Sequence, residues 1–254
     1  MESLQLLATA QVFTFILVFA RVGTALMMMP GYGEQSIPPN IRLVIALAIS
    51  FVVVPLVPLG SVTPPSNLAD FVGAIMIEFG AGAFIGASAR ILFAMLHIGG
   101  QLAGQSMGLA TLAGPTGAGF ESGAVVANFM VMSGVLMLFV TGLHIVMIEA
   151  IVASYVLFPM GQVPDFGYLA ASIARTATRS FMLAAQFASP FLVIGFLFNL
   201  GLGLTNRMMQ SLPVFFVGAP FMLAGGLLLL FACVGSILIA FTNAMGDWLY
   251  SVTG

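Results

Sequence analysis

The scarcity of charge constrains this chain more than any other feature. Its 254 residues include six arginines, no lysine and eight carboxylates, so 6% of the chain is charged and 61% is apolar. An ordinary soluble domain carries about 25% charged residues, and they keep its surface in water. Most of this chain's surface must therefore face lipid or another protein. The formal net charge of -2, with no basic cluster, excludes nucleic acid as a partner, because phosphate binding requires several cations on one face.

Six apolar runs are long enough to cross a bilayer core, which takes about 18 residues or more. Turn-forming stretches rich in Pro and Gly separate them, and no strand-like alternation competes. Asn67 and Asp165 can each cap the helix that follows. We therefore predict an all-α fold, a polytopic membrane-type bundle of about six long helices. The runs are 4–29, 41–59, 71–96, 125–158, 181–205 and 214–241.

Two apolar stretches, 71–110 and 208–246, are longer than one crossing needs. At a rise of about 1.5 Å per residue, such helices would overshoot a hydrocarbon core about 30 Å thick. We expect them either to be tilted and broken or to be buried inside a protein assembly.

Glycines recur at helical spacing on two faces. Gly100, Gly104 and Gly108 are four residues apart, and Gly82 and Gly86 repeat the spacing earlier. Small residues in this pattern let helix backbones approach closely, so we predict that all five serve helix packing.

Ionisable side chains inside apolar segments cost roughly 2.5 to 3.5 kcal/mol each on the insertion scale, so each needs a partner or a wet surface. Glu78 and Arg90 would be about 18 Å apart on a straight helix and cannot pair within it. Each partner must lie on another helix or another chain. A proton relay through Glu149, His144 and Glu78 is an alternative that the spacing does not select. The residues predicted to make polar contacts between helices or subunits are Arg21, Arg42, Glu78, Arg90 and Glu149.

The most enzyme-like string is 104–108, GQSMG, which fits the G-x-S-x-G pattern, with His144 downstream as a base. A nucleophile elbow needs a strand before the serine, whereas the flanks here are apolar and helical in pattern. An intramembrane serine protease with Ser106 and His144 on facing helices stays as the alternative function. A stand-alone secondary transporter would require inverted repeats, and no convincing internal repeat is present.

Metal and nucleotide sites find little support in this sequence. Two histidines and the single Cys233 show no metal-ligand spacing, and a P-loop cannot exist without a lysine. We expect no catalytic residues, no metal and no cofactor. Any energy for transport must then come from another protein or from an ion gradient.

Three stretches resemble one family, the FliR export-gate subunits of flagellar type III secretion and their injectisome counterparts. Residues 21–50 have an arginine in the first helix, a proline break and an Ile-Pro-x-x-x-Arg step. Residues 99–120, GGQLAGQSMGLATLAGPTGAGF, are similar to the family's Gly-Gln-rich helix end and Pro/Gly-rich loop. Residues 199–220, NLGLGLTNRMMQSLPVFFVGAP, resemble its hairpin turn and are the most specific of the three.

The resemblance implies a non-enzymatic subunit that joins FliP and FliQ homologues to form the entry pore for unfolded export substrates. The chain would combine a FliP-like part, 1–165, with a FliQ-like hairpin, 166–254. The complex would lie in lipid and protein at the bacterial inner membrane, within the flagellar basal body. An FlhB homologue would dock near the cytoplasmic entrance.

The resemblance also implies roles for two loops. The loop near 111–123 matches the family's pore plug, although it lacks the acidic residue that often precedes the family's proline. The residues assigned to the plug are Thr111, Gly114, Pro115, Thr116, Gly117, Gly119 and Phe120. The residues assigned to the cytoplasmic entrance loop are Arg207, Met208 and Met209.

Overall fold

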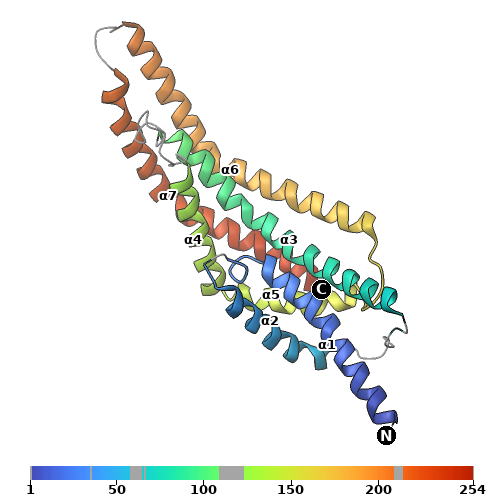
Figure 1. The fold of residues 1–254 in the computed structure, drawn as a ribbon. Helices are drawn as coiled ribbons and strands as arrows, with labels where there is room; N and C mark the ends of the chain where they lie inside the picture. Colours follow the sequence, from blue (N-terminus) through green and yellow to red (C-terminus); the bar gives the residue numbers. More distant parts are fainter. Residues whose placement is uncertain are drawn as a thin grey trace. The chain divides into compact units, whose positions relative to one another are not determined.

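The computed structural model describes residues 2–34, 36–57, 65, 67–108, 123–208 and 214–253, and no strand occurs among them. The predicted all-α, membrane-type helical bundle is confirmed (Figure 1). The elements are α1 (Glu2–Met28), α2 (Pro39–Val53), the 3-10 helix η1 (Val54–Leu56), α3 (Leu68–Ser106), α4 (Ala124–Val140), α5 (Leu143–Leu157), α6 (Phe166–Met208) and α7 (Val214–Thr253).

Two compact units make up the chain, and both are discontinuous in sequence. Unit 1 is Met1–Leu92, Leu138–Ala177 and Met245–Gly254, and unit 2 is Phe93–Met137 and Thr178–Ala244. The unit boundaries fall inside α3, α4, α6 and α7. These long helices therefore contribute residues to both units.

Within the described ranges, five helices are long and apolar enough to cross a membrane, and a sixth span arises if the bent pair α4 and α5 counts as one. Helices α3, α6 and α7 contain 39, 43 and 40 residues. At 1.5 Å per residue they would be about 58 to 65 Å long. As predicted, these helices are longer in the folded chain than a bilayer core is thick.

The sequence predicts one apolar segment over 125–158, whereas the structure has two helices there. α4 ends at Val140, α5 begins at Leu143, and the two are bent by 74° at a break that lies within unit 1. Gly142 has a φ of 75°, a left-handed conformation that costs other L-residues roughly 1 to 2 kcal/mol. Hydropathy alone does not register this break, since Thr141 and Gly142 interrupt an otherwise apolar run without a proline.

The start of α6 follows the sequence prediction. The backbone amide of Gly167 donates to the Asp165 side chain at 2.8 Å, which satisfies one of the amides that a helix start leaves free. At the start of α3, the Asn67 carbonyl accepts from the amide of Phe71 at 3.1 Å.

Unit 1 packs around α1. Its buried apolar side chains include Leu17, Val18 and Val22, none of which has exposed surface. The first half of α3 lies along α1, as Figure 1 shows, and Phe13 of α1 stacks against Phe71 of α3 at 5.6 Å between ring centroids. This packing brings the polar residues of α1 and α3 to the same interface.

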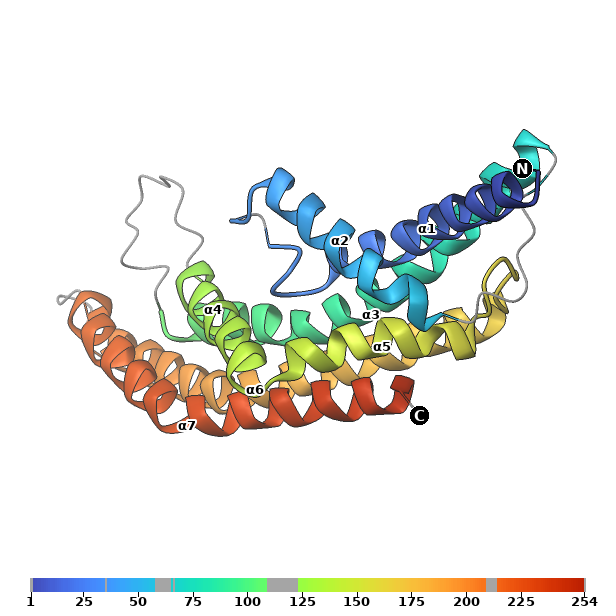
Figure 2. The same cartoon turned by 90° about the horizontal axis from the view of Figure 1, so that it is seen from below.

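Unit 2 is built from the end of α3, most of α4, and the α6–α7 hairpin. The end of α6 and the start of α7 run side by side (Figure 1, Figure 2), and Leu202 of α6 packs over Gly218 of α7. Phe93 of α3 meets Phe241 of α7 edge to face at 5.5 Å. Aromatic and small residues therefore join the helices of this unit.

A proline lies inside α6 without a break in the helix. Pro190 has no amide proton, so the carbonyl of Gln186, four residues earlier, loses its helical donor. The hydroxyl of Ser189 donates to that carbonyl at 2.9 Å. The serine thus replaces the missing backbone hydrogen bond, as neighbouring Ser and Thr side chains do in membrane helices that contain proline.

We predict that Ser189→Ala lowers the free energy of unfolding by about 1 kcal/mol, the net contribution of one hydrogen bond. In a Pro190→Ala background the backbone amide returns and the same substitution should cost nothing. Denaturant unfolding in detergent measures both differences. Equal losses in the two backgrounds would show that the hydroxyl does not compensate for the proline.

Candidate functional site

A buried ion pair lies at the interface of α1 and α3. The Nε of Arg21 is 2.7 Å from Oε2 of Glu78, and neither side chain has exposed surface. An unpaired charge in this apolar interior would cost several kcal/mol, so each residue is tolerated because of the other. Glu78 thereby has its partner on another helix of the same chain.

The second carboxylate oxygen of Glu78 binds a loop. Oε1 accepts the backbone amide of Gly161 at 3.0 Å, in the turn that joins α5 to α6. Gly161 has a φ of 75°, a conformation that glycine adopts without steric cost. One carboxylate therefore joins α1, α3 and the α5–α6 turn.

Arg21 makes further contacts with α5. Its Nη1 donates to the Ser154 hydroxyl at 3.4 Å, and its guanidinium carbon lies 4.0 Å from the centroid of the Tyr155 ring. A guanidinium stacked on an aromatic face gains a cation–π attraction that strengthens when the pair is dry. The Nη2 of Arg21 and the Tyr155 hydroxyl have no hydrogen-bond partner among the residues that the structure describes. The cluster of Arg21, Glu78, Ser154, Tyr155 and Gly161 is called the buried polar cluster below.

The buried polar cluster is arranged for rigidity. It has no exposed nucleophile, and the one carboxylate is already bound by a guanidinium and an amide. Sequence reasoning identified Arg21 and Glu78 but missed Ser154, Tyr155 and Gly161. These three residues lie 133 to 140 positions after Arg21 in the sequence. Nothing in the sequence around this serine, tyrosine or turn glycine indicates a contact with Arg21 or Glu78.

The other ionisable residues that the sequence singled out lie in different surroundings. Arg90 pairs with Glu34 at 2.9 Å, and the two side chains are 48% and 25% exposed, so this is a surface ion pair. Arg42 is partly buried and its Nε has no partner within the described part of the chain. Glu149 is exposed on α5. His97, on α3, is also exposed.

His144 lies beside the break between α4 and α5. Its Nδ1 is 3.3 Å from the carbonyl of Leu138, its ring lies 4.9 Å from that of Phe139, and its own carbonyl accepts from the Tyr32 hydroxyl at 3.2 Å. Burial raises the pKa of the Tyr32 phenol above its usual range, which keeps it a protonated donor. Across the described residues no hydrogen bond links His144 to Glu149 or Glu78, the groups of the alternative proton relay.

The five glycines predicted to serve helix packing all lie at close approaches within the described ranges. A Cβ at Gly82 would clash with the carbonyl oxygen of Arg21, and one at Gly86 would come 2.7 Å from the carbonyl oxygen of Ala25, both on α1. A Cβ at Gly100 would lie 2.6 Å from the Cα of Ala127. A Cβ at Gly104 would come similarly close to the backbone of Gly123. Gly108, which has a φ of 72°, faces the side chain of Met222.

The serine of the G-x-S-x-G string does not sit on a nucleophile elbow. Residues 68–106 form one helix that ends at Ser106, so no strand precedes the serine. The Ser106 hydroxyl donates to the carbonyl of Leu102 at 2.7 Å, one turn earlier. Among the described residues no group of three His, Cys, Asp or Glu side chains could hold a metal.

The predicted pore plug lies outside the described residues, as does Met209 of the predicted entrance loop. The plug residues concerned are Thr111, Gly114, Pro115, Thr116, Gly117, Gly119 and Phe120. Arg207 and Met208 are the last residues of α6, and both are exposed.

The fold and the buried polar cluster define a polytopic, helical membrane protein whose buried polar groups join helices. The chain belongs to the family described as bacterial export proteins, family 1, whose model matches residues 12–248. It is 37% identical to the flagellar biosynthetic protein FliR of Caulobacter vibrioides over 95% of this chain and 97% of that protein.

FliR proteins of two other bacteria are similar to this chain at lower identity. The chain is 28% identical to FliR of Escherichia coli over 85% of this chain and 80% of that protein. It is 27% identical to FliR of Aquifex aeolicus over 92% and 90% of the two chains. The family resemblance predicted from residues 21–50, 99–120 and 199–220 is therefore confirmed.

We predict that Glu78→Ala lowers the free energy of unfolding by about 3 to 5 kcal/mol, because it leaves the Arg21 charge buried and unpaired. Arg90→Leu is the matched control, since it breaks the half-exposed pair with Glu34 and should cost about 0 to 1 kcal/mol. Unfolding in detergent compares the two variants. Similar losses for both would contradict the distinction between a buried and a surface pair.

Proposed function

We propose that this chain is a subunit of the flagellar type III export gate. In this proposal it assembles with FliP and FliQ homologues in the bacterial inner membrane, within the basal body, and helps to form the entry pore for unfolded export substrates. The observation that carries the proposal is the similarity to FliR, which covers 95% of this chain and 97% of the Caulobacter protein.

Two features of the folded chain support an assembly. Helices about 58 to 65 Å long exceed a lipid core of about 30 Å, so part of their length needs protein around it. Large apolar side chains are exposed on several elements, including Phe51 at 75%, Val156 at 83% and Phe231 at 84%. Large exposed apolar side chains on membrane-type helices are covered by lipid or by other chains.

The proposed role requires no enzymatic chemistry. The chain's contribution is a rigid helical scaffold, in which the buried polar cluster ties α1, α3 and α5 together. We assign 1–165 to a FliP-like part and 166–254 to a FliQ-like hairpin, and we place an FlhB homologue near Arg207. The ion gradient would be used by partners.

Native mass spectrometry tests the assembly. The tagged chain is co-expressed with its neighbouring genes and purified in mild detergent. One copy bound to several copies of two small hydrophobic proteins is the expected result, and the tagged chain expressed alone is the control. Recovery of the chain alone, or as a simple homo-oligomer, from the co-expressing cells would contradict the proposal.

Deletion of residues 114–119 tests the plug. If the loop near 111–123 closes the pore, cells carrying this deletion should become leaky to ions and small molecules while the complex still assembles. Membrane conductance equal to that of the parent strain would contradict the plug assignment.

A further inference from the structure

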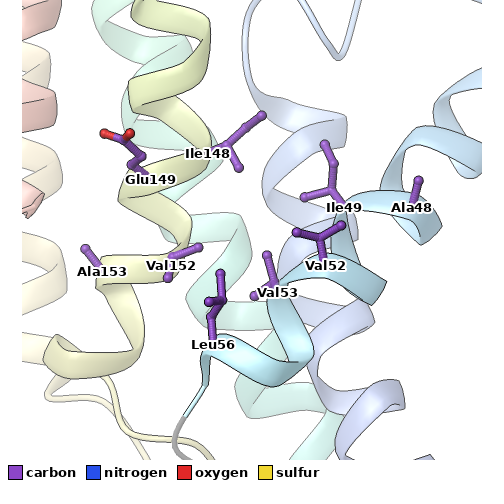
Figure 3. Close-up of a pocket in the computed structure, with 9 residues that line it drawn as sticks. All are labelled: Ala48, Ile49, Val52, Val53, Leu56, Ile148, Glu149, Val152 and Ala153. Carbon is purple, nitrogen blue, oxygen red and sulfur yellow. The ribbon is translucent and has the colours of Figure 1, made fainter.

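An apolar groove of about 690 Å³ lies in unit 1 between α5 on one side and α2 with η1 on the other. Figure 3 shows side chains of the two walls facing one another, with Val52 and Leu56 opposite Val152. The stretch from Ala48 to Leu56 corresponds to about two helical turns. The groove is therefore long enough to receive two turns of another helix.

Among the described residues that line the groove, Glu149 is the one that carries a charge. Its carboxylate points away from α2 at the edge of the groove (Figure 3). Glu149 is exposed, and its carboxylate forms no hydrogen bond or ion pair with any other described residue. An unpaired carboxylate on an apolar membrane-type helix costs roughly 2.5 to 3.5 kcal/mol on the insertion scale, so this residue needs a partner or a wet surface beyond the described residues.

Three kinds of occupant could cover the groove: lipid, a second copy of this chain or a different polypeptide. An acyl chain offers Glu149 no hydrogen-bond donor and an anionic headgroup would repel it, so a lipid could neutralise this carboxylate only through an ammonium headgroup. In a two-fold dimer the same patch faces itself, so groove against groove would bring two carboxylates together without a cation. A helix with a basic side chain fills the apolar walls and neutralises the carboxylate.

We propose that this groove docks a transmembrane helix of a different polypeptide, and that an Arg or Lys of that helix pairs with Glu149. Alanines at positions 48 and 153 leave room for a close helix approach, as small residues do at helix interfaces in membranes. The inference deepens the proposed function, because it assigns one face of the chain to a partner subunit and states the chemistry of that subunit's helix.

Photo-cross-linking in cells that express the neighbouring genes tests the proposal. A benzoylphenylalanine at position 52 probes the groove, where Val52 is 64% exposed. The same probe at position 51 is the matched control, since Phe51 is 75% exposed but does not line the groove. The expected result is a protein adduct from position 52, several-fold stronger than any adduct of the same protein from position 51.

Mapping of the adduct by mass spectrometry decides its identity. The cross-linked peptide should lie in an apolar helical segment that carries an Arg or Lys within about one turn of the contact. Glu149→Arg should lower the adduct at least five-fold, and replacing the partner's basic residue by Glu in that background should restore it. Asp70→Asn, which removes an exposed carboxylate elsewhere in unit 1, should leave the adduct unchanged.

Several results would overturn the docking proposal. They are an adduct with lipid alone, an adduct with a second copy of this chain, or an adduct of undiminished yield in Glu149→Arg. Absence of a protein adduct from position 52 also overturns it, whether or not the assembly forms. The proposed function is tested separately. It would be contradicted if no complex with FliP and FliQ homologues were recovered from wild-type cells.

Discussion

Two opposite charges without exposed surface, Arg21 and Glu78, meet at 2.7 Å inside an apolar unit, and neither could be buried without the other. Because the carboxylate also accepts the Gly161 amide, and the guanidinium reaches Ser154 and stacks on Tyr155, the pair fixes four segments relative to one another. Hydrophobic burial is non-directional, whereas these contacts have defined geometry. The cluster thus selects one arrangement of α1, α3 and α5 from the many that apolar helices could adopt.

Close packing around the pair depends on small residues. Gly82 and Gly86 place the backbone of α3 against that of α1, with Gly82 at the carbonyl of Arg21 itself. Without a hydrophobic driving force between helices in lipid, such close approaches and interhelical hydrogen bonds supply much of the association energy. The same principle extends to unit 2, where Gly100 and Gly104 bring α3 against Ala127 and Gly123, at the start of α4.

Much of the fold followed from the sequence, because hydropathy over long windows reports directly on helices that face lipid. The segments, the cap at Asp165, the glycine faces and the need of Glu78 for a partner on another helix were all readable from residue type and spacing. The break at Thr141–Gly142 was missed, since a backbone conformation at one glycine leaves no trace in hydropathy. The identity of the Glu78 partner was also beyond reach, because 57 residues and a tertiary contact separate it from Arg21.

A double-mutant cycle at Arg21 and Glu78 measures directly whether this pair organises the unit. Arg21→Met, Glu78→Leu and the combined variant are unfolded in detergent, and the coupling free energy is the difference between the double variant and the sum of the single ones. The account predicts that the double variant is far more stable than that sum, with a coupling of about 2 kcal/mol or more, because each single variant strands a buried charge. Additive losses, within about 0.5 kcal/mol, would contradict it.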